Sequence, residues 1–568
     1  MCCSSDLQVQ KTRTKTVATL TIGEFYAKET IFVCRECGKV YIPSELPTIV
    51  PPLCKFGYDT IVHVGKAALL LCQSDEQIMG DLWAKNISIS LSEITYLQKK
   101  FIVYLALIHN ESSQRIRESI EARGGYILHL DGTCDGDSPF LMSGLDEISG
   151  FVLHNVKIPS ESAESILPFL EKIKKKYGSP VAIVSDMGKG IANAIKEVFP
   201  EVPHFLCHFH FLRDIGKDLL SKENDLIRSR LRKHKINSKL LKYAHALKQN
   251  IDSNPELAGA YHSDVEGGQL SNCALEFAPL VSTYLLICWA LEGKKQGRGY
   301  GFPFDLTYVT FAERLRVLYD HLEKLVDIRL RNEWRDNRPF FKTRLDLKKV
   351  ISDKVLWQAI TDIKSKRDVF DRFRDAMRIT VDNQHRGLND DGQVVDIKTI
   401  KEGVEAFRCW LSNDSCYSPD NDYGKMITQI DKYWESLFAD PITIDTPYGK
   451  VTFQPQRTNN ILERFFREIK RDHRRKSGTS SMSKKLKAML ADTPLVKNIE
   501  NKEYVKIILN GKATLEERFA EIDAKSVREE LRKSQEHSEA IPAKLREIIK
   551  KSDLPQIVMK LFVRGVAA

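Results

Sequence analysis

The feature that most limits the fold of this chain is a block of short apolar runs at residues 126–206, each of which stops at turn residues. Runs of this kind predict buried strands, and the helical periodicity between them predicts crossover helices. Three strands with short connections, then helix, strand, helix and strand, predict a mixed α/β sheet for residues 125–210. The expected strands are Tyr126–Leu130, Pro139–Leu145, Phe151–Val156, Val181–Val184 and His204–Cys207, and the expected helices are Ser162–Tyr177 and Lys189–Val198.

Strand patterns nearly vanish after this block. Residues 211–455 have the pattern of long charged helices, such as Phe311–Arg331, and become extended only near Ile442–Phe453. We therefore expect an α/β core that is interrupted by a large all-α insertion. The core resumes with a helix in residues 456–480, and residues 481–568 form a basic helical C-terminal region.

Length and composition narrow the class of protein. A chain of 568 residues predicts two to four domains. Its 86 Lys and Arg against 76 Asp and Glu give a net charge of +10, which is a weak indication of a polyanionic partner. Met1–Lys15 lacks the apolar segment of a signal peptide, and the longest uncharged apolar stretch, Phe277–Leu291, is too short to span a membrane. We expect a cytoplasmic protein with no membrane partner.

Residues 1–73 are predicted to form a small β-rich module. Short apolar runs such as Val17–Ile22 and Thr60–Val64 alternate with turn signals. Cys34 and Cys37 have the spacing of metal ligands, and together with Cys54 and either His63 or Cys72 they could form a Zn²⁺ site. The alternative is that these cysteines are simply buried, because a zinc ribbon normally repeats the Cys-x-x-Cys pair.

Residues 74–124 are predicted to be helical and to form a helix-turn-helix DNA-binding region. Helical periodicity covers Asp75–Lys85, a second helix follows a capping box at Ser90-x-x-Glu93, and a third covers Glu111–Ala122. Such a trio is also compatible with a plain helical bundle. If the α/β core acts on DNA, a DNA-binding helix-turn-helix is the better interpretation.

Two aspartates, Asp131 and Asp186, are expected at the C-terminal ends of buried strands. Strand ends of an open sheet converge on the ligand crevice, so the two carboxylates would lie close together there. With a third carboxylate they would hold two divalent ions for phosphodiester chemistry. Taken singly, an aspartate after a strand is more often a turn or cap residue.

The third acid is expected at Glu463. On the helix of residues 456–480, Glu463 shares one stripe with Arg467, Lys470 and Arg474, as suits a metal ligand beside a phosphate backbone. An ordinary exposed Glu–Arg pair is the alternative. Glu468 lies about 140° around the helix from Glu463, where a surface ion pair with its basic neighbours explains it.

Four blocks of sequence make a family resemblance specific. They are Leu130-Asp131-Gly-Thr, Ser185-Asp186-Met-Gly-Lys-Gly, Cys207-His-Phe-His210 and Asn459-Asn-x-Leu-Glu463-Arg-x-Phe-Arg467-x-x-Lys-Arg471. In this order they resemble the motifs of DDE transposases, in particular the Mutator-like and hAT-like group and related bacterial insertion-sequence enzymes. Those enzymes have an RNase-H-like core with a helical insertion before the last acid. The resemblance covers roughly residues 126–478.

The resemblance implies a transposase that cuts the ends of a mobile element and joins them to target DNA. Asp131, Asp186 and Glu463 would bind two Mg²⁺ (or Mn²⁺) ions, and Cys207 and His210 would buttress that site, with His208 as the alternative histidine. Arg467, Lys470, Arg471 and Arg474 would bind DNA. The partners would be terminal inverted repeats and target DNA, the enzyme a dimer or larger, and its location the bacterial or archaeal nucleoid.

The insertion has a basic loop that interleaves with aromatic residues. Lys294, Lys295 and Arg298 lie in this loop and would contact phosphates near the cleavage point. Trp289 precedes it, and by the same resemblance it would stack on a flipped base. Its apolar neighbours favour the alternative that Trp289 is a core residue.

Two other functions compete with this one. Another RNase-H-like nuclease, such as a resolvase, would share the acids but would need neither an end-binding module nor the insertion. A transposase-derived DNA-binding regulator would have a damaged set of acids, whereas all three are present here.

Overall fold

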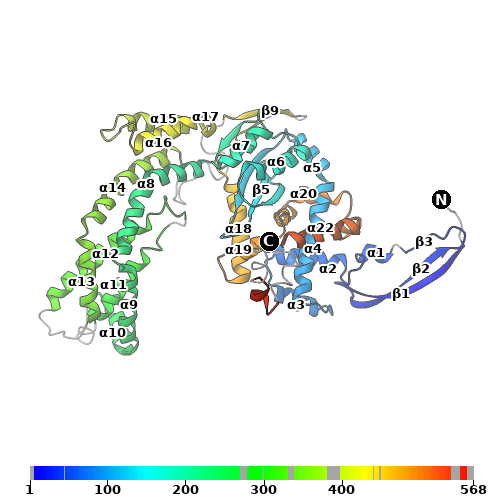
Figure 1. Ribbon diagram of the computed structural model, residues 1–568, viewed down its shortest axis with the longest axis horizontal. Coiled ribbons are helices and arrows are strands. Elements are labelled where there is room, and N and C mark those ends of the chain that lie inside the picture. The colour runs from blue at the N-terminus through cyan, green and yellow to red at the C-terminus, as the bar shows by residue number, and fades with distance from the viewer. Residues whose placement is uncertain are drawn as a thin grey trace, which may run out of the picture. The chain divides into compact units, whose positions relative to one another are not determined.

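The chain forms two compact units, Met1–Phe205 with Pro441–Ala568, and Leu206–Asp440 (Figure 1). The two parts of the first unit are far apart in sequence and fold together, so the second unit is an insertion into the first. The computed structural model describes residues 6–43, 45–268, 278–297, 300–329, 338–379, 397–438, 440–446, 449–538 and 551–558.

A five-stranded mixed sheet lies at the centre of the first unit. Its order is β6-β5-β4-β7-β8; β4 pairs antiparallel with β5 and parallel with β7, and β5 pairs antiparallel with β6. All five predicted strands and both predicted helices are present. They are β4 (Ile127–Thr133), β5 (Phe140–Asp146), β6 (Val152–Ile158), α6 (Ala163–Tyr177), β7 (Ala182–Ser185), α7 (Lys189–Val198) and β8 (His204–Leu206).

An antiparallel ribbon of β1 and β2 precedes the helices of the N-terminal region. The prediction of a strand at Thr60–Val64 is wrong. These residues lie in a helix, α2, that is buried on several sides. Gly65 lets this helix pack directly against the ring of Phe101. The elements are β1 (Leu7–Thr19), β2 (Gly23–Cys34), β3 (Val40–Tyr41), α1 (Glu45–Ile49), α2 (Tyr58–Leu69), α3 (Asp75–Trp83), α4 (Leu91–Glu111) and α5 (Ser113–Ala122).

The capping box predicted at Ser90 is confirmed. The Ser90 hydroxyl accepts from the Glu93 N–H at 3.3 Å, and the Glu93 carboxylate accepts from the Ser90 N–H at 2.8 Å. The helix that begins there, α4, is a central packing element with ten buried residues. That packing does not test whether the region reads DNA, which stays a prediction.

The C-terminal part of the first unit packs on both the sheet and the N-terminal helices. Tyr104 of α4 stacks on Phe519, with ring centroids 4.8 Å apart, and the buried His109 contacts the Tyr504 hydroxyl at 2.8 Å. The elements are β9 (Ile442–Thr446), β10 (Gly449–Phe453), α18 (Asn460–Ser477), α19 (Ser483–Ala488), the 3₁₀ helix η1 (Thr493–Glu500), α20 (Lys502–Leu509), α21 (Leu515–Ala520) and α22 (Ala524–Ser538).

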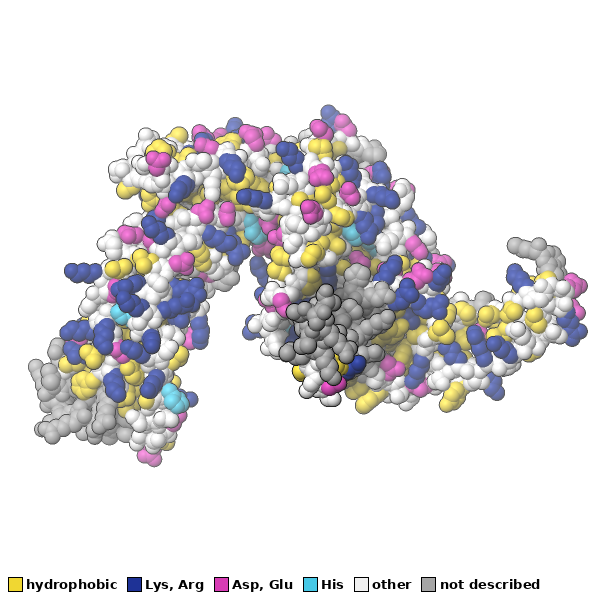
Figure 2. Space-filling view, viewed as in Figure 1, with side chains coloured by type: hydrophobic (Ala, Val, Ile, Leu, Met, Phe, Trp, Pro, Cys, Tyr) yellow, Lys and Arg dark blue, Asp and Glu magenta, His cyan; other side chains and the backbone are white. Residues whose placement is uncertain are grey.

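Apart from Leu206, the last residue of β8, the described regular elements of the second unit are all helices. Figure 2 shows Lys and Arg side chains over its helices α11 and α12. No described helix of the protein is long and apolar enough to cross a membrane. The elements are α8 (His208–Lys233), α9 (Ile236–Asp252), α10 (Pro255–Gly267), α11 (Ala278–Glu292), α12 (Thr307–Arg329), α13 (Arg338–Ile351), α14 (Lys354–Ala376), α15 (Ile397–Ser412), α16 (Asp422–Lys432) and α17 (Trp434–Leu437).

Candidate active site

Asp131 and Asp186 lie side by side at one edge of the sheet. The parallel pairing of β4 and β7 puts Leu130 opposite Ser185, so the next residues in register are these two aspartates. Neighbouring strands are about 4.8 Å apart, and paired residues of parallel strands point to the same face. The register therefore brings together the two acids that the sequence predicted.

The surroundings of the two carboxylates differ. Asp131 is buried, with 8% of its surface exposed, and accepts a hydrogen bond from the Gly132 N–H at 2.8 Å. Asp186 lies after β7 and accepts from the Gly188 N–H at 3.0 Å, at the start of α7. Burial, and then the charge of Asp186, raise the pKa of Asp131 well above its usual range, and the charges of Glu463 and Glu161 act in the same direction.

Glu161 is a fourth carboxylate of this site, which the sequence analysis missed. Burial and the charge of Asp186 raise its pKa to about 7. It lies between β6 and α6, and Gly190 of α7 packs against its carbonyl oxygen, where no side chain would fit. Strands β4, β6 and β7 run in the same direction, so acids at or just beyond their C-terminal ends lie at the same edge of the sheet. A carboxylate three residues after β6 was the signal available in the sequence.

Glu463 lies in the first turn of α18, on the side of the helix next to its buried face. Leu462 is fully buried and Phe465 nearly so, whereas the Glu463 side chain keeps 21% of its surface exposed. An Arg467 nitrogen is 3.9 Å from the Glu463 carboxylate. The i,i+4 ion pair that was the alternative from sequence is therefore present, but at a long distance for an ion pair. The charge of Glu463 contributes to the raised pKa of Asp131, so Glu463 lies within electrostatic range of that aspartate.

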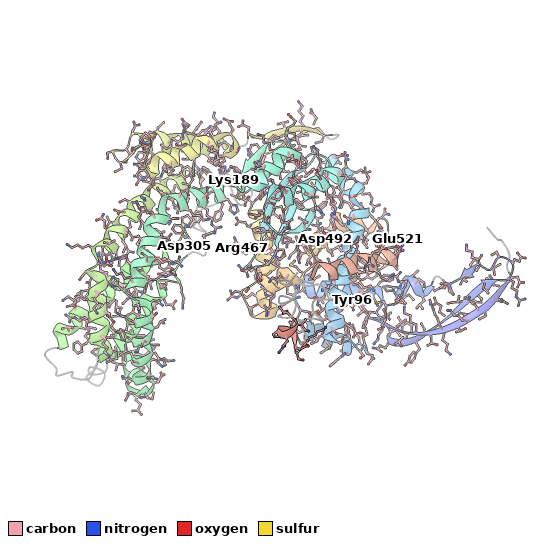
Figure 3. All side chains as sticks on the ribbon, in the orientation of Figure 1. Tyr96, Lys189, Asp305, Arg467, Asp492 and Glu521 are labelled. Atoms are coloured by element: carbon pink, nitrogen blue, oxygen red, sulfur yellow. The ribbon has the colours of Figure 1, made fainter. Side chains whose placement is uncertain are left out.

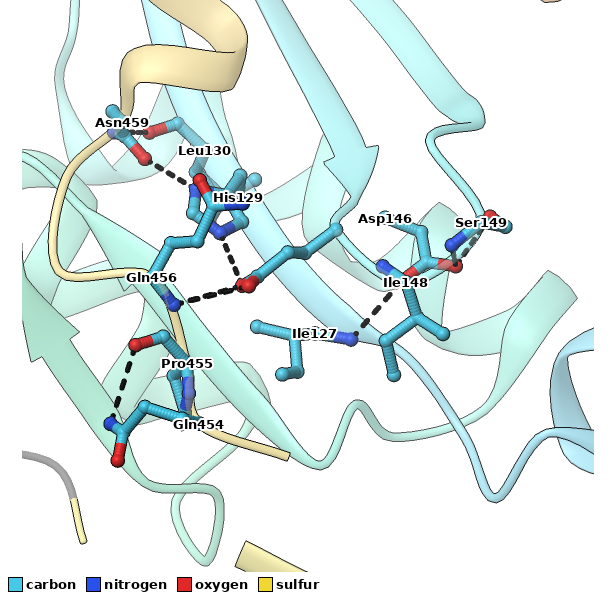
Figure 4. Close-up of polar contacts among 11 residues, drawn as sticks. Ile127, His129, Leu130, Asp146, Ile148, Ser149, Gln454, Pro455, Gln456 and Asn459 are labelled. Carbon is cyan, nitrogen blue, oxygen red and sulfur yellow. Dashed lines mark hydrogen bonds and ion pairs between the residues drawn. The ribbon is translucent and has the colours of Figure 1, made fainter. Parts of the chain in front are cut away.

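A buried hydrogen-bond network fixes the start of α18 on β4 (Figure 4). The Asn459 amide donates to the Leu130 carbonyl at 2.8 Å, and its oxygen is 2.8 Å from Nδ1 of His129. The other ring nitrogen of His129 is 2.9 Å from Glu147, which also accepts from the Gln456 N–H at 3.1 Å. One helical turn later comes Glu463, whose N–H donates to the Asn459 carbonyl at 2.8 Å.

The predicted DNA-contacting residues of α18 are exposed to solvent. They are Arg467, which Figure 3 labels, with Lys470, Arg471 and Arg474. Glu468 forms an ion pair at 3.2 Å with Lys497 of η1, which replaces the expected pairing within its own helix. The exposed stripe can contact a polyanion without disturbing the packed face.

This set of oxygen donors suits a hard divalent cation chemically. Burial first, and then repulsion from neighbouring carboxylates, raises the pKa values of Asp131 and Glu161, and a cation would relieve that repulsion. Among the described residues, no group of three or more His, Cys, Asp or Glu side chains is arranged to hold a metal ion. The carboxylate oxygens are of the type that a divalent cation prefers, and the binding of such an ion is part of the proposed function.

Residues 149–214 match the family model of the MULE transposase domain. This segment runs from the turn before β6 to the first turns of α8 and includes Glu161, Asp186, Cys207 and His210. This match supports the interpretation of the chain as a Mutator-like transposase, a class of protein that binds DNA. No curated protein matches the chain.

The last part of the MULE-like segment belongs to the second unit. Cys207 is fully buried at the start of α8, and His210 lies in the first turn. The neighbouring His208 is buried and contacts the Leu437 carbonyl. The support that Cys207 and His210 would give to the acids stays a prediction.

The basic loop of the second unit has local partners. Lys294 contacts Asn237 at 3.2 Å, and Lys295 forms an exposed ion pair with Glu292. Trp289 is 39% exposed and is covered on one face by the Arg314 guanidinium, 4.5 Å from the ring centroid. Arg298 lies outside the described residues.

The structure does not bring together the three cysteines considered for zinc. Cys34 pairs with Leu7 at one end of the β1–β2 ribbon. Cys54 lies near the other end, because the carbonyl of the next residue, Lys55, accepts a hydrogen bond from the Ala18 N–H. About ten strand residues, roughly 33 Å, separate those ends. Cys34 and Cys54 are buried and Cys37 is exposed, which fits the alternative of ordinary buried cysteines for the first two.

Proposed function

We propose that this chain is a DDE transposase, with an RNase-H-like core in the first unit and an all-α insertion in the second. The observation that carries the proposal is the parallel register that puts Asp131 beside Asp186, with the Glu463 charge acting on the same group. The MULE match, which includes Asp186, supports it from an independent direction.

Asp131, Asp186 and Glu463 would hold two Mg²⁺ or Mn²⁺ ions, with Glu161 close by. When bound, the ions would supply charge neutralisation at the attacking and leaving oxygens of a phosphodiester. Zinc is not part of the proposal, because the structure separates Cys34 from Cys54.

The chain's own residues position the reacting groups. Arg467, Lys470, Arg471 and Arg474 hold the DNA backbone by charge, and the Asn459 network fixes the helix on which Glu463 lies. Water attacks a phosphodiester at the element's end, one P–O bond breaks, and a 3′-hydroxyl is released. That hydroxyl then attacks target DNA, again exchanging one P–O bond for another. Neither step needs a covalent enzyme intermediate.

Synapsis of two ends would require a dimer or larger assembly. A resolvase-like nuclease could use the same acids, but the MULE match favours the transposase. A regulator without catalysis is the outcome if the acids prove dispensable.

The test is cleavage of labelled DNA that carries the inverted repeats flanking the gene. Asp131→Asn and Asp186→Asn should abolish Mg²⁺- or Mn²⁺-dependent cleavage, because each removes a charge that the transition state needs. DNA binding, measured by fluorescence anisotropy, should stay within a few-fold of the parent. Asp137→Asn is the matched control, since Asp137 is exposed and pairs with Lys487. Full cleavage by either active-site variant would refute the assignment.

A further inference from the structure

A pocket of about 70 Å³ lies beside the C-terminal half of α18, and nothing in the proposed reaction uses it. Its walls come from the end of α2 and from α18, α19 and η1. Ile469, Met489 and Val496 supply apolar surface. Lys476, Lys485 and Lys497 bring three ammonium groups to the pocket, against the single carboxylate of Asp472, and His473 also lines it. A single water needs about 10–15 Å³ of such space, so there is room for a small hydrated anion but not for a large ligand.

The three ammonium groups differ in how many hydrogen-bond and ion-pair partners they have within the protein. Lys476 donates to the Ala68 carbonyl, and Lys497 pairs with Glu468 at 3.2 Å. The Lys485 ammonium has no hydrogen bond or ion pair within the described ranges of the chain. The carboxylate that acts on it most, Asp75, is hydrogen-bonded by Gln98 at 2.8 Å.

The positive charges around the pocket favour the binding of an anion. Burial lowers the pKa values of both Lys476 and Lys485, and the Lys485 charge lowers that of Lys476 further. Asp75 acts in the opposite direction on both lysines, and Asp472 does so on Lys476, but neither outweighs burial. Two half-buried cations that repel one another carry a cost that an anion between them would remove. A compact anion with several oxygens fits three ammonium donors, and apolar walls suit the non-ionic part of such a ligand.

The pocket also lies next to the predicted DNA path. Ile469, His473 and Lys476 follow one another along one flank of α18, beside the stripe that includes Lys470 and Arg474. Lys476 is 13 residues beyond Glu463, or roughly 20 Å along the helix. A DNA strand bound along this stripe could therefore place one of its phosphates in the pocket. That phosphate would be a different one from the phosphate that reacts.

We propose that the Lys476–Lys485–Lys497 pocket binds a phosphate group, either a non-reacting phosphate of a DNA strand or a free phosphate ion. The DNA source rests on the proposed function, and the free-ion source does not.

Lys485→Gln tests the proposal in the full-length protein. It removes the charge, keeps most of the length and leaves no ion-pair partner behind. Lys484→Gln is the matched control, because Lys484 is the exposed neighbour in α19 and does not line the pocket. In the first arm, affinity for a random-sequence duplex is measured against salt concentration. Loss of one phosphate contact should reduce the slope of log K against log salt by about 0.9 in Lys485→Gln and leave it unchanged in Lys484→Gln.

The second arm measures thermal unfolding in inorganic phosphate and in chloride at equal ionic strength. A free phosphate ligand should raise the Tm of the parent and of Lys484→Gln in a saturable way, but not that of Lys485→Gln. A change in the first arm alone identifies the DNA backbone, and a change in the second alone identifies the free ion. If the two lysine variants behave alike in both arms, the proposal is overturned. An active Asp131→Asn would instead refute the proposed reaction and leave both binding measurements interpretable.

Discussion

At the scale of single residues, Glu463 and Glu468 occupy different surroundings although they are five residues apart on α18. The charge of Glu463 acts on the buried Asp131, whereas Glu468 is held by Lys497 on the other side of the helix. Glu463→Gln should therefore abolish cleavage, because it keeps the shape and removes the charge. Glu468→Gln should retain cleavage and lose at most about 0.5–1 kcal/mol from the ion pair. Cleavage of labelled DNA, with circular dichroism for folding, checks both. An active Glu463 variant beside an inactive Glu468 variant would reverse the assignment.

His154 predicts a dependence of stability on pH. It stacks on Phe169 beneath α6, and burial, with the charges of Lys172 and Lys176, lowers its pKa to about 2. The unfolded histidine binds a proton below about pH 6.5 and the folded one does not, so stability is lost as pH falls from 6.5 toward 2.

His154→Phe removes this proton uptake and keeps an aromatic ring. Between pH 7.5 and pH 5 the variant should gain about 2 kcal/mol relative to the parent, and comparison of the two pH values cancels any constant packing effect. Urea unfolding at each pH measures the change. Parallel pH profiles for the two proteins would show that His154 does not contribute.

At the scale of elements, α18 matters because one helix joins an acid of the site to the DNA-facing stripe. Its first residue is preceded by Asn459, whose side chain bonds to β4 and does not cap the helix. Asn459→Ala should lower kcat for cleavage by about 10–100-fold, since Glu463 loses its fixed position, while KM for DNA stays unchanged. Faster hydrogen exchange in the first turn of α18 should accompany the loss.

A second asparagine provides the control for this element. Asn501→Ala removes a helix cap, because the Asn501 side chain accepts from the N–H groups of Glu503 and Tyr504 at the start of α20. It also removes a 3.2 Å hydrogen bond to the Ser149 carbonyl, away from the carboxylates of the site. It should lower stability by about 1 kcal/mol and leave kcat unchanged. Equal losses of kcat in the two variants would mean that Asn459 acts only through stability.

At the scale of the whole molecule, the sheet, the N-terminal helices and the C-terminal helices share one core within the first unit. Phe519 of α21 is fully buried and contacts Phe101 and Tyr104 of α4. Phe519→Ala should lower the free energy of unfolding by roughly 3–5 kcal/mol, whereas Phe341→Ala, at a 46% exposed position, should change it by less than about 0.5 kcal/mol. Hydrogen exchange should accelerate in β4 as well as in α21. Acceleration confined to residues 502–538 would show that the C-terminal helices unfold separately.

The sequence by itself determined the features that depend on near neighbours. The strand runs of residues 126–206, the Ser90 capping box and the stripe of α18 arise from periodicity and local hydrogen bonds, which a linear pattern records. Asp131 and Asp186 could be selected because each follows an apolar run. The run at Thr60–Val64 misled, because a short buried segment of β-branched residues has no periodicity that separates strand from helix.

The tertiary structure alone decided what depends on distant partners. It brought Glu161 within electrostatic range of Asp186. It also paired Glu468 with Lys497 and joined Asn459 to β4 through contacts between residues far apart in the chain. It also separated Cys34 from Cys54, because Cys34 lies at one end of the β1–β2 ribbon and the backbone next to Cys54 bonds to Ala18 near the other end. Spacing along the sequence cannot give these results, since register and packing, which the whole core sets together, fix which side chains meet.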